Sequence, residues 1–111
     1  MNVKLIIPEE PGYNMVREYG TAIAGIAGGF TATRATGVRA NDEGYLCVEP
    51  VVVFDCYVDD DYLAATASAG WNSCNPVKLF RDLARRIADD LNQDCVYVEI
   101  DHKCEFVKGT E

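Results

Sequence analysis

The chain has 111 residues, of which 18 are acidic and 10 basic, so its formal net charge is −8. This acidic balance argues against a nucleic-acid-binding protein, which needs a basic face to neutralise phosphates, and suits a cationic ligand or a basic partner. No apolar run approaches the roughly 20 residues that a membrane-spanning helix needs, and no signal-peptide pattern begins the chain. We therefore expect one cytoplasmic domain over residues 1–111 that binds neither nucleic acid nor membrane.

The first third of the chain predicts a strand, a helix and a second strand. Residues 3–7 form an apolar, strand-like run that a proline ends. From about Asn14 apolar residues recur at steps of three and four, which predicts a helix ending at Gly28. The members of this stripe are Met15, Val16, Tyr19, Ile23 and Ile26. Residues 30–38 alternate threonines with small apolar residues and indicate the second strand.

The middle of the chain predicts a turn, a long strand and a loop. Residues 41–44 are rich in turn-forming types, and residues 45–58 form the longest strand-like run. Pro50 cannot donate a ladder hydrogen bond, so we expect a sheet edge or a bulge there. Residues 59–73 form a loop long enough to suggest a lid or an interface, in which Trp71 either covers a site or anchors the packing.

The last third predicts a helix and a half-buried strand. Asn75 and Pro76 are typical of an N-cap and a first helical position. The helix then carries one apolar stripe, made of Phe80, Leu83, Ala84, Ile87 and Leu91. Residues 96–100 alternate apolar with polar types, residues 105–107 add a short strand, and residues 108–111 are expected to fray.

These elements follow the order β-α-β-β-α-β. That order is typical of the ferredoxin-like fold, an α+β architecture in which two helices cover one face of an antiparallel sheet. The fold class by itself assigns no function.

The cysteines and short motifs give no conventional catalytic signature. The five cysteines are odd in number and include no CxxC pair, and His102 is the only histidine, so neither a disulfide framework nor a zinc site is indicated. Cys47, Cys56 and Cys95 lie within strand-like runs, where a reduced cysteine acts as a small buried hydrophobe. Nucleotide-binding and hydrolase motifs are absent, and no metal or cofactor is expected.

Two polar positions stand out against this background. Glu49 interrupts an apolar strand, where a carboxylate is either paired, functional or turned toward an exposed face of the sheet. Gln93 and Asp94 occupy the corner between the second helix and the last strand, as a plain polar turn or as part of a site.

The sequence around these positions resembles the phage-encoded S-adenosylmethionine (SAM) lyases, formerly called SAM hydrolases. The resemblance extends over residues 22–107 and is carried by a few separated motifs. They are Gly29-Phe30, Thr36-Gly37, Glu49 with Cys56 seven residues later, and Gln93-Asp94-Cys95-Val96-x-Val98.

The resemblance implies a ferredoxin-like homotrimer with active sites between subunits. Such enzymes convert SAM to 5′-methylthioadenosine and homoserine lactone, through attack of the substrate's own carboxylate on its γ-carbon. A reaction of this kind needs no nucleophile, metal or cofactor from the protein. It needs a substrate held in a reactive conformation, so it is compatible with a chain that has no catalytic motif.

Residue by residue, the resemblance makes Glu49 the catalytic glutamate, which holds the substrate ammonium. Gln93 would bind the methionyl part of the substrate, with Asp94 in a supporting role. The family also has a tyrosine ahead of the glutamate, and its spacing leads here to Val38-Arg39. Tyr45, which the period-two pattern places on the same strand face as Glu49, is the candidate replacement.

Two other classes of function fit the same sequence. One is a small acidic phage-type protein that inhibits a basic host protein by charge mimicry, for which the acidic runs Asp59-Asp60-Asp61 and Asp89-Asp90 are suited. The other is a ferredoxin-like regulatory or assembly domain without catalysis. A SAM lyase would lower the SAM supply and so counter host restriction and methylation.

Overall fold

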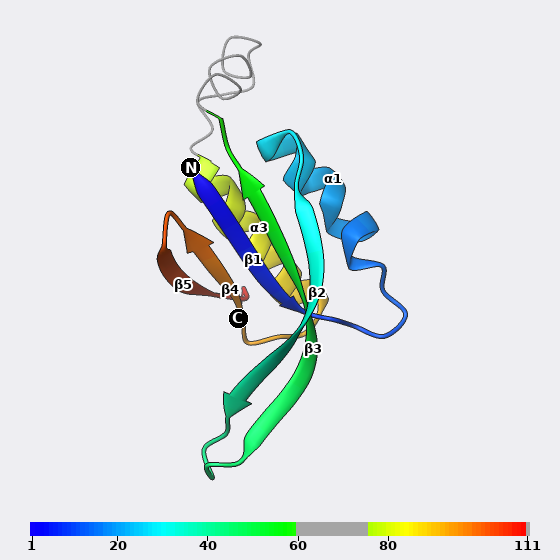
Figure 1. Cartoon of the computed structure of the whole chain (residues 1–111), viewed down its shortest axis with the longest axis vertical. Coiled ribbons are helices and arrows are strands. Elements are labelled where there is room, and N and C mark those ends of the chain that lie inside the picture. The colour runs from blue at the N-terminus through cyan, green and yellow to red at the C-terminus, as the bar shows by residue number, and fades with distance from the viewer. Residues whose placement is uncertain (60–75, 111) are drawn as a thin grey trace.

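The structure, a computed structural model, describes residues 1–59 and 76–110 (Figure 1). Its elements are β1 (Asn2–Pro8), α1 (Met15–Ala27), β2 (Thr31–Ala40), β3 (Leu46–Tyr57), α3 (Pro76–Asp90), β4 (Cys95–Ile100) and β5 (Lys103–Lys108). The predicted loop at 59–73, Trp71 and the Asn75 cap lie almost wholly outside the described residues. Among the described helices, none is long and apolar enough to cross a membrane.

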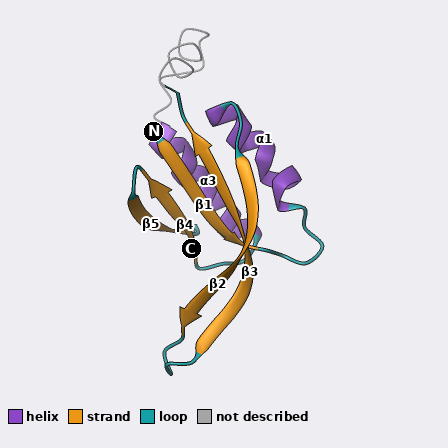
Figure 2. Ribbon diagram, viewed as in Figure 1, coloured by secondary structure: helices purple, strands orange, loops and turns teal. Residues whose placement is uncertain are grey.

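The described strands form one antiparallel sheet in the order β2-β3-β1-β4-β5 (Figure 2). The first four positions in this order are those of the ferredoxin-like fold, and the predicted α+β class is confirmed. β5 extends the sheet beyond that pattern. It pairs with β4 along its whole length, through a tight turn in which Asp101 and His102 both have positive φ.

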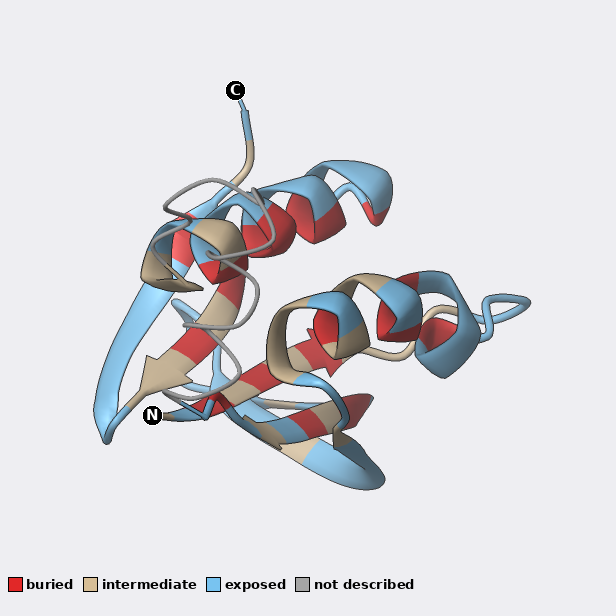
Figure 3. Ribbon diagram, turned by 90° about the horizontal axis from the view of Figure 1, so that it is seen from above, coloured by how far each residue is buried: buried red, intermediate tan, exposed pale blue. Residues whose placement is uncertain are grey.

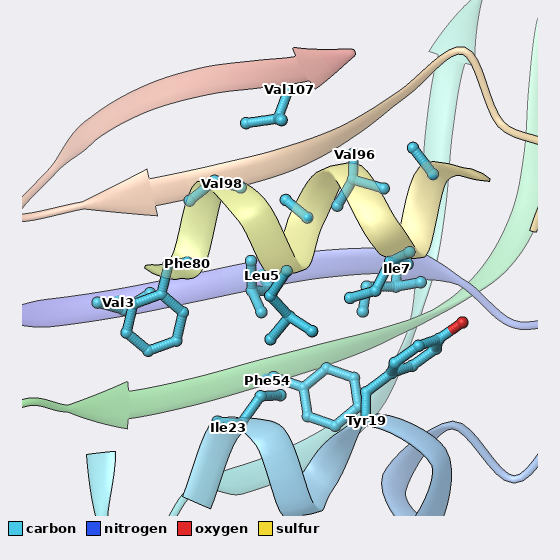
Figure 4. Packing of buried hydrophobic residues seen from close by; sticks show 14 of the residues in the cluster. Val3, Leu5, Ile7, Tyr19, Ile23, Phe54, Phe80, Val96, Val98 and Val107 are labelled. Atoms are coloured by element: carbon cyan, nitrogen blue, oxygen red, sulfur yellow. The ribbon is translucent and has the colours of Figure 1, made fainter. Parts of the chain in front are cut away.

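Both described helices lie on one face of the sheet, and the buried side chains gather between these two layers (Figure 3). The strands alternate, so that every second residue points toward the helices. From the sheet the core receives Val3, Leu5, Ile7, Val52, Phe54, Val96, Val98 and Val107, and from the helices chiefly Met15, Tyr19, Ile23, Phe80, Leu83, Ala84 and Ile87 (Figure 4). Val16 of the predicted stripe is exposed, since α1 buries a narrower face than its sequence suggested.

The ends of α1 follow from two residues. The Asn14 Oδ1 accepts a hydrogen bond from the Arg17 N–H at 3.1 Å, which caps the helix start. Gly28 adopts φ 83°, in the left-handed region that glycine enters without strain, and its N–H donates to the Ala24 carbonyl at 2.7 Å. The predicted start and end of this helix are both confirmed.

The β2–β3 hairpin extends beyond the rest of the sheet (Figure 1). Its register is unbroken from Thr31↔Asp55 to Ala40↔Leu46, so the bulge considered at Pro50 is absent. The Pro50 carbonyl instead accepts from the Glu9 N–H at 2.9 Å, which places the proline's missing N–H on the side of β1, just where that strand ends. Pro50 therefore marks a local edge, as its chemistry requires.

The C-terminal residues are held against α3, so the fraying predicted from residue 108 is wrong through residue 110. The Asp89 carboxylate accepts from both the N–H and the hydroxyl of Thr110, and these bonds lower the pKa of Asp89. The Gly109 N–H donates to the Asp94 carbonyl at 3.2 Å. A Cβ at Gly109 would lie 2.7 Å from Asp89 Oδ1, so a side chain at this position would displace the Asp89 carboxylate.

Candidate functional site

The open face of the sheet, opposite the helices, carries a hollow of about 420 Å³ at the base of the projecting hairpin. Figure 1 is viewed from this face, with the helices behind the sheet. Five strands and the α3–β4 connection contribute to its lining, which is Ile6, Pro8, Gly37, Val38, Arg39, Glu49, Val51, Gln93, Asp94, Cys95, Tyr97 and Phe106. The hollow thus brings together three of the four residues selected from the sequence: Glu49, Gln93 and Asp94.

Glu49 lies on β3 directly opposite Gly37 of β2, and it is half-buried. It therefore does face the open side of the sheet, but its neighbours shield part of it. A Cβ at Gly37 would approach Val51 Cγ1 to 3.0 Å and Glu49 Cγ to 3.8 Å, so the glycine leaves space beside the glutamate. Within the described residues, Glu49 takes part in no ion pair. Its carboxylate is available to a cation.

The corner at Gln93 is fixed by the way α3 ends. Asn92 adopts φ 53°, the Gln93 N–H donates to the Ala88 carbonyl at 2.8 Å, and the Asn92 N–H donates to the Asp89 carbonyl at 3.2 Å. These two bonds form a Schellman motif, with asparagine in the left-handed position that glycine usually occupies. The corner is therefore a turn held by backbone hydrogen bonds, and it places Gln93 in the lining of the hollow. Gln93 is half-buried and Asp94 is exposed.

Replacing Asn92 tests this local account. Asn92→Ala should lower the free energy of unfolding by about 1 kcal/mol, because alanine is strained in the left-handed region, whereas Asn92→Gly should change it little. Urea unfolding of the two variants and the wild type measures the difference. Equal stability of the alanine and glycine variants would contradict the assigned Schellman geometry.

The apolar side of the hollow contains an aromatic pair that the sequence did not single out. Tyr97 of β4 and Phe106 of β5 meet edge to face, with ring centroids 5.6 Å apart. Phe106 is 64% exposed, and the Tyr97 hydroxyl donates to Glu99 Oε1 at 2.9 Å, a bond that raises the pKa of Tyr97. The period-two pattern could have placed Tyr97 on the open face, but Phe106 depends on the β4–β5 register, which no sequence pattern specified.

Tyr45, the candidate replacement for the family tyrosine, is not in the hollow. It precedes β3 at the hairpin tip, where its N–H donates to Asn41 Oδ1 at 2.9 Å, and it is 68% exposed. The hairpin carries it away from Glu49 within the same chain.

Two other hollows suit a small ligand less well. One, of about 360 Å³ beside the start of α1, includes Glu9 and Arg34, whose side chains already neutralise each other in an ion pair of 2.9 Å. The other, of about 400 Å³, includes Lys4 together with its strand neighbours Asp55 and Glu99. Each contains one exposed tyrosine, Tyr13 in the first and Tyr57 in the second, whereas the hollow near Glu49 contains two aromatic rings in contact.

Groups of metal ligands and cysteine thiols with a shifted pKa are two further features of the described part of the chain that bear on its chemistry. No group of three or more potential metal ligands gathers among residues 1–59 and 76–110. Cys47, Cys56 and Cys95 are only half-buried, so the prediction that they are buried is wrong in degree. Burial raises the pKa of Cys56 to about 11, which keeps its thiol neutral near pH 7.

The geometry defines a ferredoxin-like domain with a partly apolar hollow on its open face, and the fold has counterparts among solved structures. A phage SAM lyase in complex with S-methyl-5′-thioadenosine matches with a TM-score of 0.57 and 15% identity, over 97% of this chain and 88% of that chain. A phage SAM lyase in the apo state matches with a TM-score of 0.57 and 16% identity, over 99% of this chain and 90% of that one.

No family model and no curated protein matches the chain. The structural likeness, at this low identity, shows a shared fold. It concerns the same family that the sequence motifs resemble.

Proposed function

We propose that this protein is a SAM-degrading enzyme and that the hollow on the open face is its substrate site. The observation that carries the proposal is the convergence of Glu49, Gln93 and Asp94, far apart in sequence, on one hollow in this fold. The volume of about 420 Å³ lies within the range of roughly 300–1,000 Å³ that small-molecule sites occupy.

The chemistry of SAM matches the lining. Its ammonium group suits the Glu49 carboxylate, and Gln93 can hydrogen-bond the methionyl chain, with Asp94 adding negative charge beside it. The adenine ring and the sulfonium suit Tyr97 and Phe106, since aromatic faces stack with bases and attract cations.

The proposed reaction is intramolecular. A carboxylate oxygen of SAM attacks the γ-carbon, the bond from that carbon to sulfur breaks, and its electron pair stays on sulfur. The products are neutral 5′-methylthioadenosine and homoserine lactone, and no proton or water is consumed. The two opposite charges that react are neutralised in the transition state, so an apolar wall such as Ile6, Pro8 and Val51 favours it over the charged ground state. Orientation by Glu49 supplies the rest.

Incubation with SAM in ¹⁸O-labelled water tests this step. The intramolecular route predicts methylthioadenosine together with lactone, which on later opening carries the label only in its carboxyl group. Direct attack of water on SAM would place the label in the γ-hydroxyl of homoserine and would contradict the lyase route. Failure to form methylthioadenosine would contradict the enzyme as a whole.

The projecting hairpin supports assembly into homotrimers with sites between subunits, which we include in the proposal. Val38, Leu46 and Val48 are 58%, 72% and 65% exposed on it. Val48 and Leu46 share the face of β3 that farther along the strand is buried under the helices, but here no described element covers them. A neighbouring copy on this surface would also bring Tyr45 toward a second hollow. Such an enzyme would act in the cytoplasm of the host cell of a phage and lower its SAM.

Leu46→Glu tests the assembly. We expect the wild type to have three times the 12.2 kDa chain mass in solution and the variant to shift to the monomer mass, because a charge would be buried at the contact. Light scattering after size exclusion measures both. Val16→Glu, at an exposed apolar position on α1, is the matched control and should remain trimeric. A monomeric wild type would refute the trimer.

A further inference from the structure

We infer that Arg39 binds the α-carboxylate of the substrate and makes the site selective for amino-acid-bearing nucleosides. This inference rests on the proposed function and adds to it a recognition residue that the function did not use. It begins with the place of Arg39 in the sheet. Arg39 of β2 pairs with Cys47, and Gly37 pairs with Glu49, so Arg39 and Glu49 are diagonal neighbours on the same face.

Diagonal neighbours in an antiparallel pair lie roughly 7–8 Å apart, within reach of two long side chains. The two side chains carry opposite charges and line the same hollow. Nevertheless, Arg39 and Glu49 form no ion pair with each other or with any other residue in the described part of the chain. Arg34, three positions before Gly37 and on the opposite face of β2, differs in this respect because it binds Glu9 at 2.9 Å.

An α-amino acid presents the complementary pattern. Its ammonium and carboxylate groups branch from one carbon, so a carboxylate and a guanidinium side by side can hold both ends at once. Guanidinium groups are well suited to carboxylates, since their planar donors match the carboxylate oxygens. Gly37 lies directly opposite Glu49 and two positions from Arg39 on the same face, and its missing side chain leaves room for the backbone of the amino acid.

A guanidinium bound to the substrate carboxylate would also orient the attacking oxygen. A guanidinium that holds one carboxylate oxygen fixes the direction of the other, which is the attacking atom. The acidic surroundings of Glu49 and Asp94 would otherwise repel the substrate carboxylate, and Arg39 offsets that repulsion.

The test uses two nucleosides that the enzyme cannot cleave by this route, S-adenosylhomocysteine and its decarboxylated counterpart. Both have an uncharged thioether in place of the sulfonium, and they differ only in the carboxylate, whose loss leaves the ammonium as the one charge of the decarboxylated compound. Calorimetry should show that the wild type prefers S-adenosylhomocysteine by about tenfold, the size expected for one charged hydrogen-bonded contact. Arg39→Gln should remove this preference by weakening S-adenosylhomocysteine alone, and Arg39→Lys should retain part of it.

Arg17→Gln, which removes the same charge from the exposed surface of α1, is the matched control and should behave as the wild type. Equal weakening of both nucleosides by Arg39→Gln, or no weakening, would overturn the role of Arg39 while leaving the proposed function standing. A wild-type protein that binds neither these nucleosides nor methylthioadenosine would overturn the proposed function, and the inference with it.

Discussion

Glu49→Gln should reduce the rate of SAM cleavage at low substrate concentration by about 100-fold, a loss of about 2.7 kcal/mol of transition-state stabilisation. Glutamine has nearly the shape of glutamate but lacks the charge that holds the substrate ammonium. The change should leave the thermal midpoint close to that of the wild type, because Glu49 takes part in no ion pair within the described residues. Initial rates of methylthioadenosine formation measure the effect.

Glu18→Gln is the matched control for this loss of charge. Glu18 lies exposed on α1, on the other side of the sheet from the hollow, and its variant should keep the wild-type rate. Full activity of Glu49→Gln would show that the assignment of the catalytic site is wrong, even if the protein cleaves SAM.

Replacing a phenylalanine on each face of the sheet should have opposite effects on stability and on ligand binding. Phe54 is 1% exposed and faces the helices, whereas Phe106 is 64% exposed and faces the hollow. Phe54→Ala should lower the free energy of unfolding by about 3–5 kcal/mol, because it leaves a cavity in the core. Phe106→Ala should cost about 1 kcal/mol or less in stability, and instead weaken the binding of methylthioadenosine by about tenfold, the loss of one stacking contact.

Urea unfolding and calorimetry on the same two variants give both quantities. The same substitution on two strands of one sheet thus separates packing from binding. If Phe106→Ala lost several kcal/mol of stability without a change in affinity, the open face would be a packing surface and the hollow would not be the ligand site.

The order and approximate bounds of the elements follow from the sequence because local patterns determine them. The helical stripe through Phe80 and Ile87 and the alternation of Val96 and Val98 each report which face is buried. The point at which the second hairpin strand begins is harder to predict from the sequence. The period-two pattern predicts that Tyr45 shares a strand face with Glu49, but β3 begins after Tyr45, and the turn at Asn41 holds it at the hairpin tip.

The site was predictable only in part, for a physical reason. Glu49 was conspicuous as a charge within an apolar strand, and Gln93 was conspicuous at a change of period, so both could be selected before any pairing was known. Arg39 and Phe106 have no such local signal, because an exposed arginine or phenylalanine on an edge strand looks ordinary. Only the registers Arg39↔Cys47 and Tyr97↔Phe106 bring them to the hollow.

The ordered C-terminal residues also could not be predicted from a local sequence pattern. A short polar tail normally frays, and its composition gave no reason to expect otherwise. Thr110 is nevertheless bound by Asp89, and Gly109 packs against the corner that carries Gln93. Contacts between segments of this kind depend on the tertiary arrangement and have no periodicity to reveal them.

The most direct test of the central claim is the conversion of SAM by the purified wild-type protein, followed by chromatography. We predict that methylthioadenosine appears in proportion to protein concentration and time, well above the spontaneous decay of SAM. A charge-mimicking inhibitor or a regulatory domain would give no such product. Methylthioadenosine at the level of the protein-free control would contradict the proposed function.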